Sequence, residues 1–334
     1  MSGKDEELRW MRVAAALSPG KEASASVDRQ GAIVEQRTRA EAVGARLLVV
    51  DDDDYPAHLR TIPAPPPFLF LRGELRSEDA LAVALVGSRH ATSYGIETAE
   101  RLAEELAVRG VTVVSGFARG IDTAAHRGAL RGGGRTVAVL GSGVDVIYPP
   151  ENRRAVEQVL RAGALVSQFP MGTPPLQHHF PLRNRTIAGM SLGTVVVEAA
   201  EQSGALITAG HAGELGREVF AVPGSINSAT SRGAHRLIQD GAKLVQGWDD
   251  VIAELSPVWR QCLKEPGAAA LVSPPEGDEG RLLSLLGADP THIERLIERS
   301  NLPSGRAAAL LTTLELQGWV RQLPGQMYIQ TRPM

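Results

Sequence analysis

Residues 111–120 read Val-Thr-Val-Val-Ser-Gly-Phe-Ala-Arg-Gly, an apolar run that stops at a turn of small residues. A short buried strand that ends in such a turn and continues as a helix leaves free backbone N–H groups pointing at one place, where an anion binds. Two further runs share the pattern, Ala82–Val86 before Gly87-Ser88-Arg89 and Thr136–Leu140 before Gly141-Ser142-Gly143. Two of the three turns also carry an arginine, whose planar guanidinium matches phosphate oxygens. We expect a phosphorylated ligand at the carboxyl ends of a parallel sheet.

The same pattern continues on both sides of this segment, because strand-like apolar runs alternate with helical patterns between residues 81 and 255. Such alternation is typical of right-handed βαβ units. We therefore predict an α/β fold, a Rossmann-like domain whose sheet is mostly parallel, with helices on both faces. The predicted strands are Ala82–Val86, Val111–Ser115, Thr136–Leu140, Ala164–Gln168, Thr194–Val197, Val219–Val222 and Lys243–Val245.

The flanking segments predict accessory domains. Residues 1–50 carry short amphipathic helical patterns, which predict a small helical domain. The Rossmann-like domain takes residues 51–255, and the Pro- and Gly-rich composition of residues 256–276 indicates a linker. Residues 277–334 show three short helical patterns and a hairpin, which predict a winged-helix domain. The acidic run at residues 51–54 is interpreted as a solvated turn.

Composition narrows the class of protein and its location. With 334 residues, of which 43% are hydrophobic and 22% charged, the chain fits a soluble multi-domain α/β protein. The charged N-terminus lacks a following apolar segment, and no run approaches the roughly 20 apolar residues of a membrane span. We therefore expect a cytoplasmic protein with no membrane partner. The single cysteine, Cys262, excludes an intrachain disulfide and a thiolate metal site.

The charge of the chain is close to balanced, so a basic site has to come from local clustering. The net charge is −3, and only four of the 35 Lys and Arg residues are lysines. Such a bias toward arginine arises from GC-rich coding or from selection for guanidinium chemistry, and we favour the coding bias. An anion site therefore depends on where individual arginines lie.

Residues 115–130 form the most specific segment of the chain. Arg119 lies at the entry to the predicted helix, and Asp122 and His126 fall one turn apart on the same helix face. An Asp/His pair at this spacing is compatible with an acid–base relay or with half of a metal site. We favour a structural hydrogen bond that fixes the loop, because a metal needs further ligands that the sequence does not place.

A second cluster of polar residues lies further along the chain. Arg183 and Arg185 flank Asn184 before an apolar helical stretch. We expect this arrangement to gather two guanidinium groups and an amide near a helix start. Phe180 is interpreted either as a core residue or as a base-stacking aromatic, since single-strand sites pair a stacking ring with a cationic track.

Motifs of cofactor binding and nucleophilic catalysis are missing at the three turns. Gly141-Ser142-Gly143 follows a strand but lacks the third glycine of a dinucleotide fingerprint, and the sequence contains no Walker A motif. Neither Ser88 nor Ser115 lies in a Gly-x-Ser-x-Gly elbow. We expect no cofactor and no catalytic serine.

The remaining candidates for chemistry are two histidines and two glutamates. His178 and His179 are adjacent and point in different directions, which argues against a zinc site. Glu198 and Glu201 follow a predicted strand and are the best carboxylates for hydrolysis. We favour capping or packing for both glutamates.

Taken together, these motifs resemble the bacterial DNA-processing protein A family, also known as DprA or Smf. The resemblance implies an extended Rossmann fold that binds single-stranded DNA, protects incoming DNA and loads the RecA recombinase in natural transformation and recombination. It also implies a homodimer without enzymatic activity and accessory domains at both ends of the chain, of which the helical one at residues 1–50 is SAM-like. The segments that carry the resemblance are Gly87–Arg89, Ser115–Asp122, Ala125-His126, Gly141–Gly143 with Tyr148-Pro149, Phe180–Arg185 and Ala221–Gly224.

The resemblance also implies which residues of this chain contact DNA. Arg89, Arg119 and the Arg183-Asn184-Arg185 triplet look like phosphate-contacting positions, and Phe180 resembles the base-stacking position. Gln177 stands where many family members carry lysine, so the site loses one charge. No catalytic residue, metal or cofactor is implied. The expected DNA-binding residues are Gly87, Ser88, Arg89, Ser115, Gly116, Arg119, Gln177, Phe180, Arg183, Asn184 and Arg185.

Two other functions stay open at this point. A nucleotide-processing hydrolase would use the same cleft with Glu198 or Glu201 as the base, and it would release a free base or ribose phosphate from nucleoside monophosphates. A winged-helix scaffold would instead recruit proteins through the C-terminal domain. The winged-helix fold alone does not decide between DNA and protein contacts.

Overall fold

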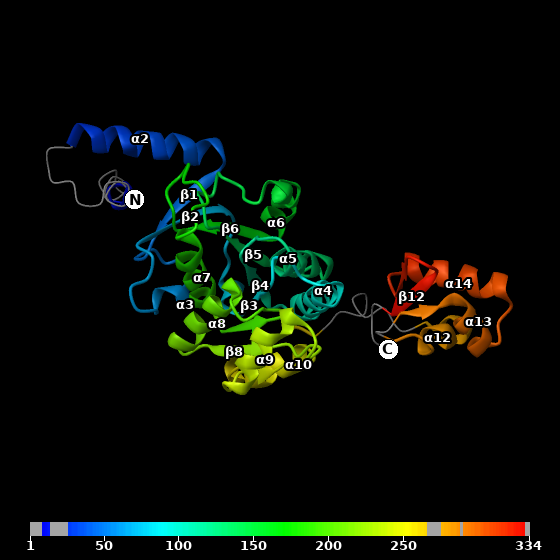
Figure 1. The fold of residues 1–334 in the computed structure, drawn as a ribbon. Coiled ribbons are helices and arrows are strands. Elements are labelled where there is room, and N and C mark those ends of the chain that lie inside the picture. The colour runs from blue at the N-terminus through cyan, green and yellow to red at the C-terminus, as the bar shows by residue number, and fades with distance from the viewer. Residues whose placement is uncertain (1–8, 14–25, 266–274, 288–289, 331–334) are drawn as a thin grey trace. The chain divides into compact units, whose positions relative to one another are not determined.

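The computed structural model describes residues 9–13, 26–265, 275–287 and 290–330. The chain divides into two units, Met1–Glu265 and Pro266–Met334 (Figure 1). Each unit has its own hydrophobic core. Among the described residues, no helix is long and apolar enough to cross a membrane.

A nine-stranded sheet forms the centre of the first unit. Its strands are β1 (Ala45–Val49), β2 (Phe68–Gly73), β3 (Ala82–Val86), β4 (Thr112–Ser115), β5 (Thr136–Val139), β6 (Gly163–Ser167), β7 (Gly193–Val196), β8 (Glu218–Ala221) and β9 (Lys243–Leu244). Their order is β1-β2-β6-β5-β4-β3-β7-β8-β9. The strands from β3 to β9 run parallel, whereas β1 and β2 are antiparallel at one edge. All seven predicted apolar runs are strands, which confirms the mostly parallel α/β sheet.

The helices of the first unit surround this sheet. The α-helices are α2 (Ser26–Ala42), α3 (Ala57–Arg60), α4 (Ser93–Val108), α5 (Ile121–Arg131), α6 (Val156–Ala162), α7 (His179–Met190), α8 (Gly204–Glu214), α9 (Arg232–Gln239), α10 (Trp248–Glu254) and α11 (Pro257–Arg260). The 3-10 helices are η2 (Ser77–Ala80), η3 (Pro150–Ala155) and η4 (Ala229–Ser231).

Both faces of the sheet are covered, because its central strands are apolar on both sides. Val83 and Leu85 of β3 belong to one hydrophobic cluster, which they share with α4, α5 and α10. Ala84 and Val86 alternate into a second cluster with α3, α7 and α8. Figure 1 accordingly shows α4 and α5 on one side of the sheet and α7 on the other. The predicted coverage on both faces is confirmed.

The structure differs from the sequence prediction at both ends of this unit. Strand β1 lies within residues 1–50, where only helices were expected, and it pairs with β2 in the main sheet. At the other end, α11 begins the predicted linker, and Trp259 and Leu263 pack against the core. The backbone N–H of Lys264 donates to the carbonyl of Arg109 at 2.9 Å. The sheet therefore begins at residue 45, and the unit continues to residue 265.

The second unit has the predicted winged-helix arrangement. Its elements are α12 (Gly277–Ser284), β10 (Thr291–His292), α13 (Ile293–Ser300), α14 (Ser304–Leu316), β11 (Val320–Leu323) and β12 (Met327–Gln330). The strands form a three-stranded sheet in the order β10-β12-β11. Leu296, Leu311 and Trp319 are among the buried residues that join the helices to this small sheet.

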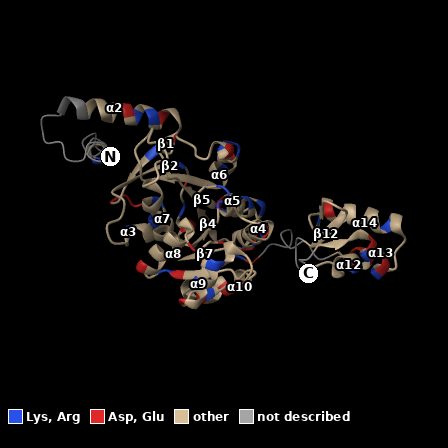
Figure 2. Cartoon of the chain, in the orientation of Figure 1, with Lys and Arg blue, Asp and Glu red and all other residues tan. Residues whose placement is uncertain are grey.

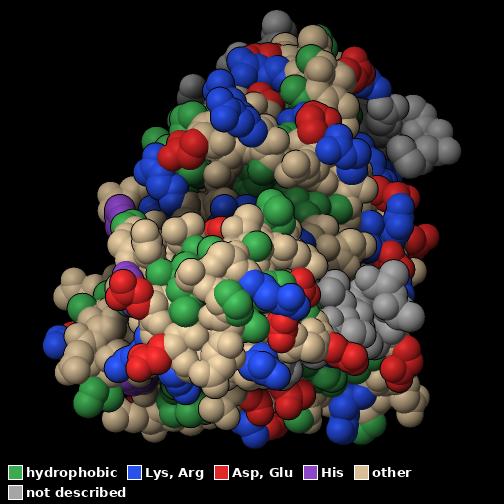
Figure 3. All heavy atoms as spheres, turned by 90° about the vertical axis from the view of Figure 1, so that its right-hand side faces the viewer, with side chains coloured by type: hydrophobic (Ala, Val, Ile, Leu, Met, Phe, Trp, Pro, Cys, Tyr) green, Lys and Arg blue, Asp and Glu red, His purple; other side chains and the backbone are tan. Residues whose placement is uncertain are grey.

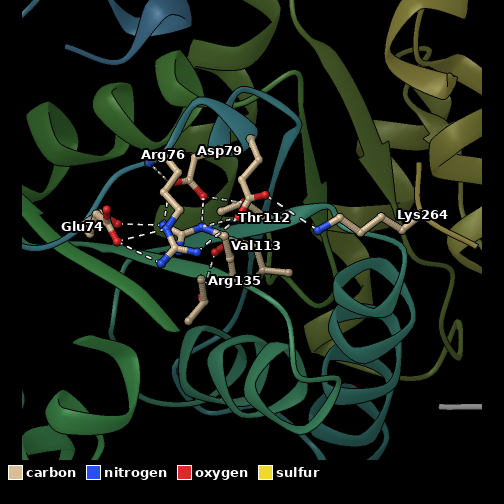
Figure 4. A network of polar contacts seen from close by, with 9 residues as sticks. Glu74, Arg76, Asp79, Thr112, Val113, Arg135 and Lys264 are labelled. Atoms are coloured by element: carbon tan, nitrogen blue, oxygen red, sulfur yellow. Dashed lines mark hydrogen bonds and ion pairs between the residues drawn. The ribbon is translucent and has the colours of Figure 1, made fainter. Parts of the chain in front are cut away.

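A network of polar contacts ties together the amino ends of the parallel strands (Figure 4). We call it the amino-end network, and it consists of Glu74, Asp79, Thr112 and Arg135. Arg135 donates from Nε and Nη2 to the two carboxylate oxygens of Asp79 at 2.6 and 2.8 Å, and from Nη2 to the carbonyl of Glu74 at 2.7 Å. Thr112 Oγ1 donates to Asp79 at 2.8 Å. The hydrogen bonds to Asp79 raise the pKa of Arg135, so its charged form is stabilised.

Candidate functional site

Two adjoining cavities open at the carboxyl ends of β3, β4 and β5, and we call them together the carboxyl-end pocket. Their volumes are about 430 and about 30 Å³, and they share Arg89, Ala118, Phe180 and Arg183. The larger cavity is also lined by Val86, Gly87, Ser88, His90, Asp122, Gln177, Pro181, Asn184, Ile187, Ser203, Gly204, Ala205, Ile207 and Thr208. The smaller one is also lined by Gly116, Arg119, Gly141, Ser142, Tyr148, Pro149 and Pro175.

Glycines allow the turns to approach each other at this pocket. A Cβ at Gly87 would lie 2.5 Å from Cγ1 of Ile121, the first residue of α5. A Cβ at Gly116 would overlap the guanidinium of Arg183. Because real Cβ contacts are never this short, only glycine lets the turns after β3 and β4 close around α5 and Arg183.

Arg183 is the buried cation of the pocket, with 3% of its surface exposed. Its Nη1 donates to the carbonyl of Gly116 and, at 2.8 Å, to the carbonyl of Val139, while Nε donates to Asn184 Oδ1 at 3.0 Å. Burial lowers the pKa of Arg183 to about 10, so the side chain stays charged at neutral pH. One guanidinium thus joins the carboxyl ends of β4 and β5 and places a positive charge inside the pocket.

Arg89 is the exposed cation of the pocket. Its guanidinium carbon lies 4.8 Å from the centre of the Phe180 ring, whereas that of Arg183 lies 5.7 Å from the same ring. No carboxylate within the described ranges forms an ion pair with Arg89. An arginine without a carboxylate partner beside an aromatic ring is free to take a phosphate.

Arg119 adds a third cation at the rim of the smaller cavity. It pairs with Glu151, and about half of each side chain is exposed, at 54% and 51%. Water and salt screen an ion pair this exposed, so a phosphate can displace Glu151 at little cost.

Elsewhere on the molecule, positive and negative side chains are mixed. Figure 2 shows Lys and Arg scattered among Asp and Glu along the helices and strands. On the face drawn in Figure 3, basic and acidic side chains are again interspersed. The positive character of the pocket therefore comes from Arg89, Arg119 and Arg183 rather than from an overall excess of charge.

Asp122 and His126 both have structural contacts in the protein interior. Asp122 is buried and accepts a hydrogen bond from the backbone N–H of Ala118 at 3.3 Å, so it fixes the loop before α5 through the loop backbone and not through the expected bond along the helix face. His126 Nδ1 lies 2.7 Å from Thr136 Oγ1, and burial lowers the pKa of His126 to about 3, so the ring is neutral. Within the described ranges, no group of three His, Cys, Asp or Glu side chains is arranged to hold a metal.

Two of the eleven predicted site residues lie outside the pocket. Ser115 is buried, and its hydroxyl donates to the carbonyl of Leu85 at 2.6 Å. Arg185 donates to the carbonyls of Pro63 and, at 3.1 Å, Ala64. Residues two positions apart on an α-helix project about 200° apart, so Arg183 and Arg185 point to different sides of α7. The expectation that both arginines gather at one place is wrong.

The structure also adds pocket residues that sequence reasoning missed. Ser203, Gly204, Ile207 and Thr208 reach the larger cavity from the start of α8. The only sequence signal for them is the serine, which caps α8 by accepting the backbone N–H of Ala205 at 3.3 Å. Their approach to Gly87 depends on β7 pairing with β3.

The two candidate carboxylates for hydrolysis do not line either cavity. Glu198 is buried and accepts hydrogen bonds from the backbone N–H and the hydroxyl of Thr92, at 2.9 and 2.6 Å. Thr92 is the N-cap of α4, so Glu198 holds the start of that helix, which confirms the capping alternative. Glu201 is exposed in the following turn.

Comparisons with known proteins agree with this geometry. The model of the DNA recombination-mediator protein A family matches residues 46–256, and that of the DprA winged helix domain matches residues 266–326. Protein Smf of Escherichia coli is 40% identical over 291 residues, covering 86% of this chain and 77% of its own. The DNA processing protein DprA of Streptococcus pneumoniae is 46% identical over 203 residues, covering 61% of this chain and 72% of its own.

Solved structures show the same fold. The X-ray structure of DNA processing protein A from Streptococcus pneumoniae has a TM-score of 0.61 and 38% identity, and the match covers 75% of this chain and 93% of that one. The DNA processing protein A of Helicobacter pylori, which binds single-stranded DNA, has a TM-score of 0.57 and 27% identity. That match covers 63% of this chain and 94% of the other.

Proposed function

This chain belongs to the DNA recombination-mediator protein A family, and from that membership and the geometry of the carboxyl-end pocket we propose that it binds single-stranded DNA. The observation that carries the proposal is the environment of Arg89, an exposed guanidinium that has an aromatic ring at 4.8 Å and no carboxylate partner in the described part of the chain. Single-strand sites combine these same two features, a cation for the backbone and a ring for the bases.

The division of labour among the pocket residues follows from their burial. Arg89 and Arg119 are exposed and contact phosphates directly, while the buried Arg183 supplies positive charge from the wall of the pocket. Phe180 is partly exposed between the two cavities and stacks on a base. Every base offers a flat face, so we expect little preference for sequence.

We propose that binding is not coupled to catalysis. The best carboxylate, Glu198, accepts hydrogen bonds from Thr92 and does not line the pocket.

The role we propose is to protect incoming single strands and to load the RecA recombinase onto them in natural transformation and recombination. Support for that role comes from the family, whose description is that of a DNA recombination mediator. Partners would be single-stranded DNA, RecA and a second copy of the chain, in the cytoplasm.

Binding is tested by fluorescence anisotropy with labelled oligo-dT and the wild-type protein, Arg89→Ala and Arg76→Ala. A charge-assisted hydrogen bond contributes about 1.5–3 kcal/mol, so Arg89→Ala should weaken binding about tenfold or more. Arg76 is an exposed arginine paired with Glu74 at 2.9 Å near the amino-end network, so Arg76→Ala is the matched control and should bind like wild type. Equal affinity of all three proteins would refute the proposed site.

The recombinase role is tested by RecA filament assembly on oligo-dT coated with single-strand binding protein. We expect the full chain to accelerate assembly and Arg89→Ala to lose that effect.

Deleting residues 276–334 tests whether the pocket is sufficient for DNA binding, because removal of the winged helix should spare oligo-dT binding. If the deletion abolishes DNA binding, the strand contacts the winged helix as well, and the proposal that the pocket suffices is wrong.

A further inference from the structure

Tyr148 faces the proposed stacking residue across the smaller cavity of the pocket. It follows the turn after β5, whereas Phe180 belongs to α7, so two separate elements bring the rings together. The ring centres are 6.3 Å apart and the ring planes are inclined by 50°. A base between two parallel rings needs about 3.5 Å of van der Waals separation on each face, so about 7 Å between the rings. The two rings now form a tilted pair at a slightly shorter distance, so they have to part before a base can enter.

The two rings differ in how firmly they are held. Phe180 lies against the turn after β5, where a Cβ at Gly141 would be 3.0 Å from ring atom Cδ1, and the Arg89 guanidinium lies beside the same ring. Tyr148 is 40% exposed, and no hydrogen bond to its hydroxyl is found among the described residues. The adjacent Pro149 is buried in the cavity wall and anchors the backbone at that point. Tyr148 can therefore change its side-chain rotamer while Phe180 stays in place.

The space between the rings is too small for a base until Tyr148 moves. A cavity of about 30 Å³ holds about one water molecule. For a base to enter, the exposed tyrosine has to rotate out of its tilted contact with Phe180. The same cavity is lined by Arg89, Arg119 and Arg183, so a base that entered it would have cations at its flanking phosphates.

From these observations, and on the basis of the single-strand function proposed above, we propose that Tyr148 is a second base-stacking residue, which closes on Phe180 to clamp one nucleobase between the two rings. The clamp deepens the proposed function by adding a mobile wall to a fixed one. It recognises any flat, unpaired base, and it excludes a base that is held within a duplex.

The clamp is tested with two tyrosine variants and two ligands. Tyr148→Phe keeps the ring and removes the hydroxyl, whereas Tyr148→Leu keeps an apolar side chain and removes the ring. Anisotropy is measured with oligo-dT and with a strand of the same length made of abasic sites. Loss of stacking on one base corresponds to about tenfold in affinity. We expect Tyr148→Leu to bind oligo-dT about tenfold more weakly than wild type, and Tyr148→Phe to bind it equally well.

The abasic strand distinguishes stacking from an indirect effect on the pocket. We expect wild type and Tyr148→Leu to bind that strand equally well, because the strand offers no base to clamp. If Tyr148→Leu binds oligo-dT like wild type, or loses the same factor on both strands, Tyr148 is not a stacking residue. If wild type binds neither strand, the proposed single-strand function is wrong, and the proposed clamp is then wrong as well.

Discussion

The two ends of the parallel sheet use the same guanidinium group for different purposes. At the amino end, Arg135 has both oxygens of Asp79 and a backbone carbonyl as partners, so its hydrogen-bonding capacity is directed at the protein. At the carboxyl end, Arg89 is exposed and forms no ion pair among the described residues, while the buried Arg183 donates to backbone carbonyls and lies near the buried Asp122. Positive charge that the protein does not neutralise is available to a ligand. The groups that an arginine contacts therefore indicate whether it stabilises the fold or binds a ligand, which the presence of the arginine alone does not.

The largest effect is expected at Arg183, which serves both purposes. Arg183→Ala would leave the carbonyls of Gly116 and Val139 without their donor and would remove the cation beside the buried Asp122. Removing one partner of a buried charged cluster costs about 3–5 kcal/mol, so we expect a lower midpoint of urea unfolding together with loss of oligo-dT binding. Full stability with lost binding would show that the residue does not organise the strand ends.

Arg135 should affect stability alone. Its side chain is 13% exposed and that of Asp79 is 8% exposed, so Arg135→Ala leaves a largely buried carboxylate without its partner. We expect a loss of about 2 kcal/mol in the free energy of unfolding, somewhat below the value for a fully buried pair. Oligo-dT affinity measured on the folded variant should equal that of wild type. Weaker binding by Arg135→Ala would contradict the separation of the two ends.

Arg89 should show the opposite behaviour. Arg89→Ala removes an exposed side chain, so the free energy of unfolding should stay within about 0.5 kcal/mol of wild type. Binding should fall about tenfold, equivalent to about 1.4 kcal/mol. Urea unfolding and anisotropy are therefore measured on both Arg89→Ala and Arg135→Ala. We expect Arg89→Ala to lose affinity and Arg135→Ala to lose stability. The comparison fails if both variants lose the same property.

The smallest overall effect among these variants is expected at Arg185. Sequence reasoning places it beside Arg183, but its guanidinium donates to the carbonyls of Pro63 and Ala64. We expect Arg185→Ala to change oligo-dT affinity less than twofold, since no phosphate contact is lost. A loss comparable with that of Arg89→Ala would mean that Arg185 turns toward the strand when DNA binds.

Much of the fold could be predicted because its signals are local. The runs before Gly87, Gly116 and Gly141 are apolar, short and closed by small residues, and all three are strands that end at the pocket. Strand β1 was missed because a five-residue run next to a helical segment carries little periodic signal, and its pairing with β2 is a tertiary contact.

The pocket was predicted less completely because part of it depends on strand order. Ser203–Thr208 reach the larger cavity only because β7 lies beside β3, which brings together segments more than 100 residues apart in the chain. Similarly, the separation of Arg183 from Arg185 depends on both residues lying within α7, since an extended segment would project them to the same side.

The salt dependence of oligo-dT binding tests whether the carboxyl-end pocket holds phosphates. For single strands, the slope of log K against log salt concentration changes by about 0.7 for each phosphate contact. The slope for Arg89→Ala should therefore be shallower than that of wild type by about 0.7, while Arg135→Ala keeps the wild-type slope. Identical slopes for wild type and Arg89→Ala would show that Arg89 contacts no phosphate, which would contradict our interpretation of the pocket.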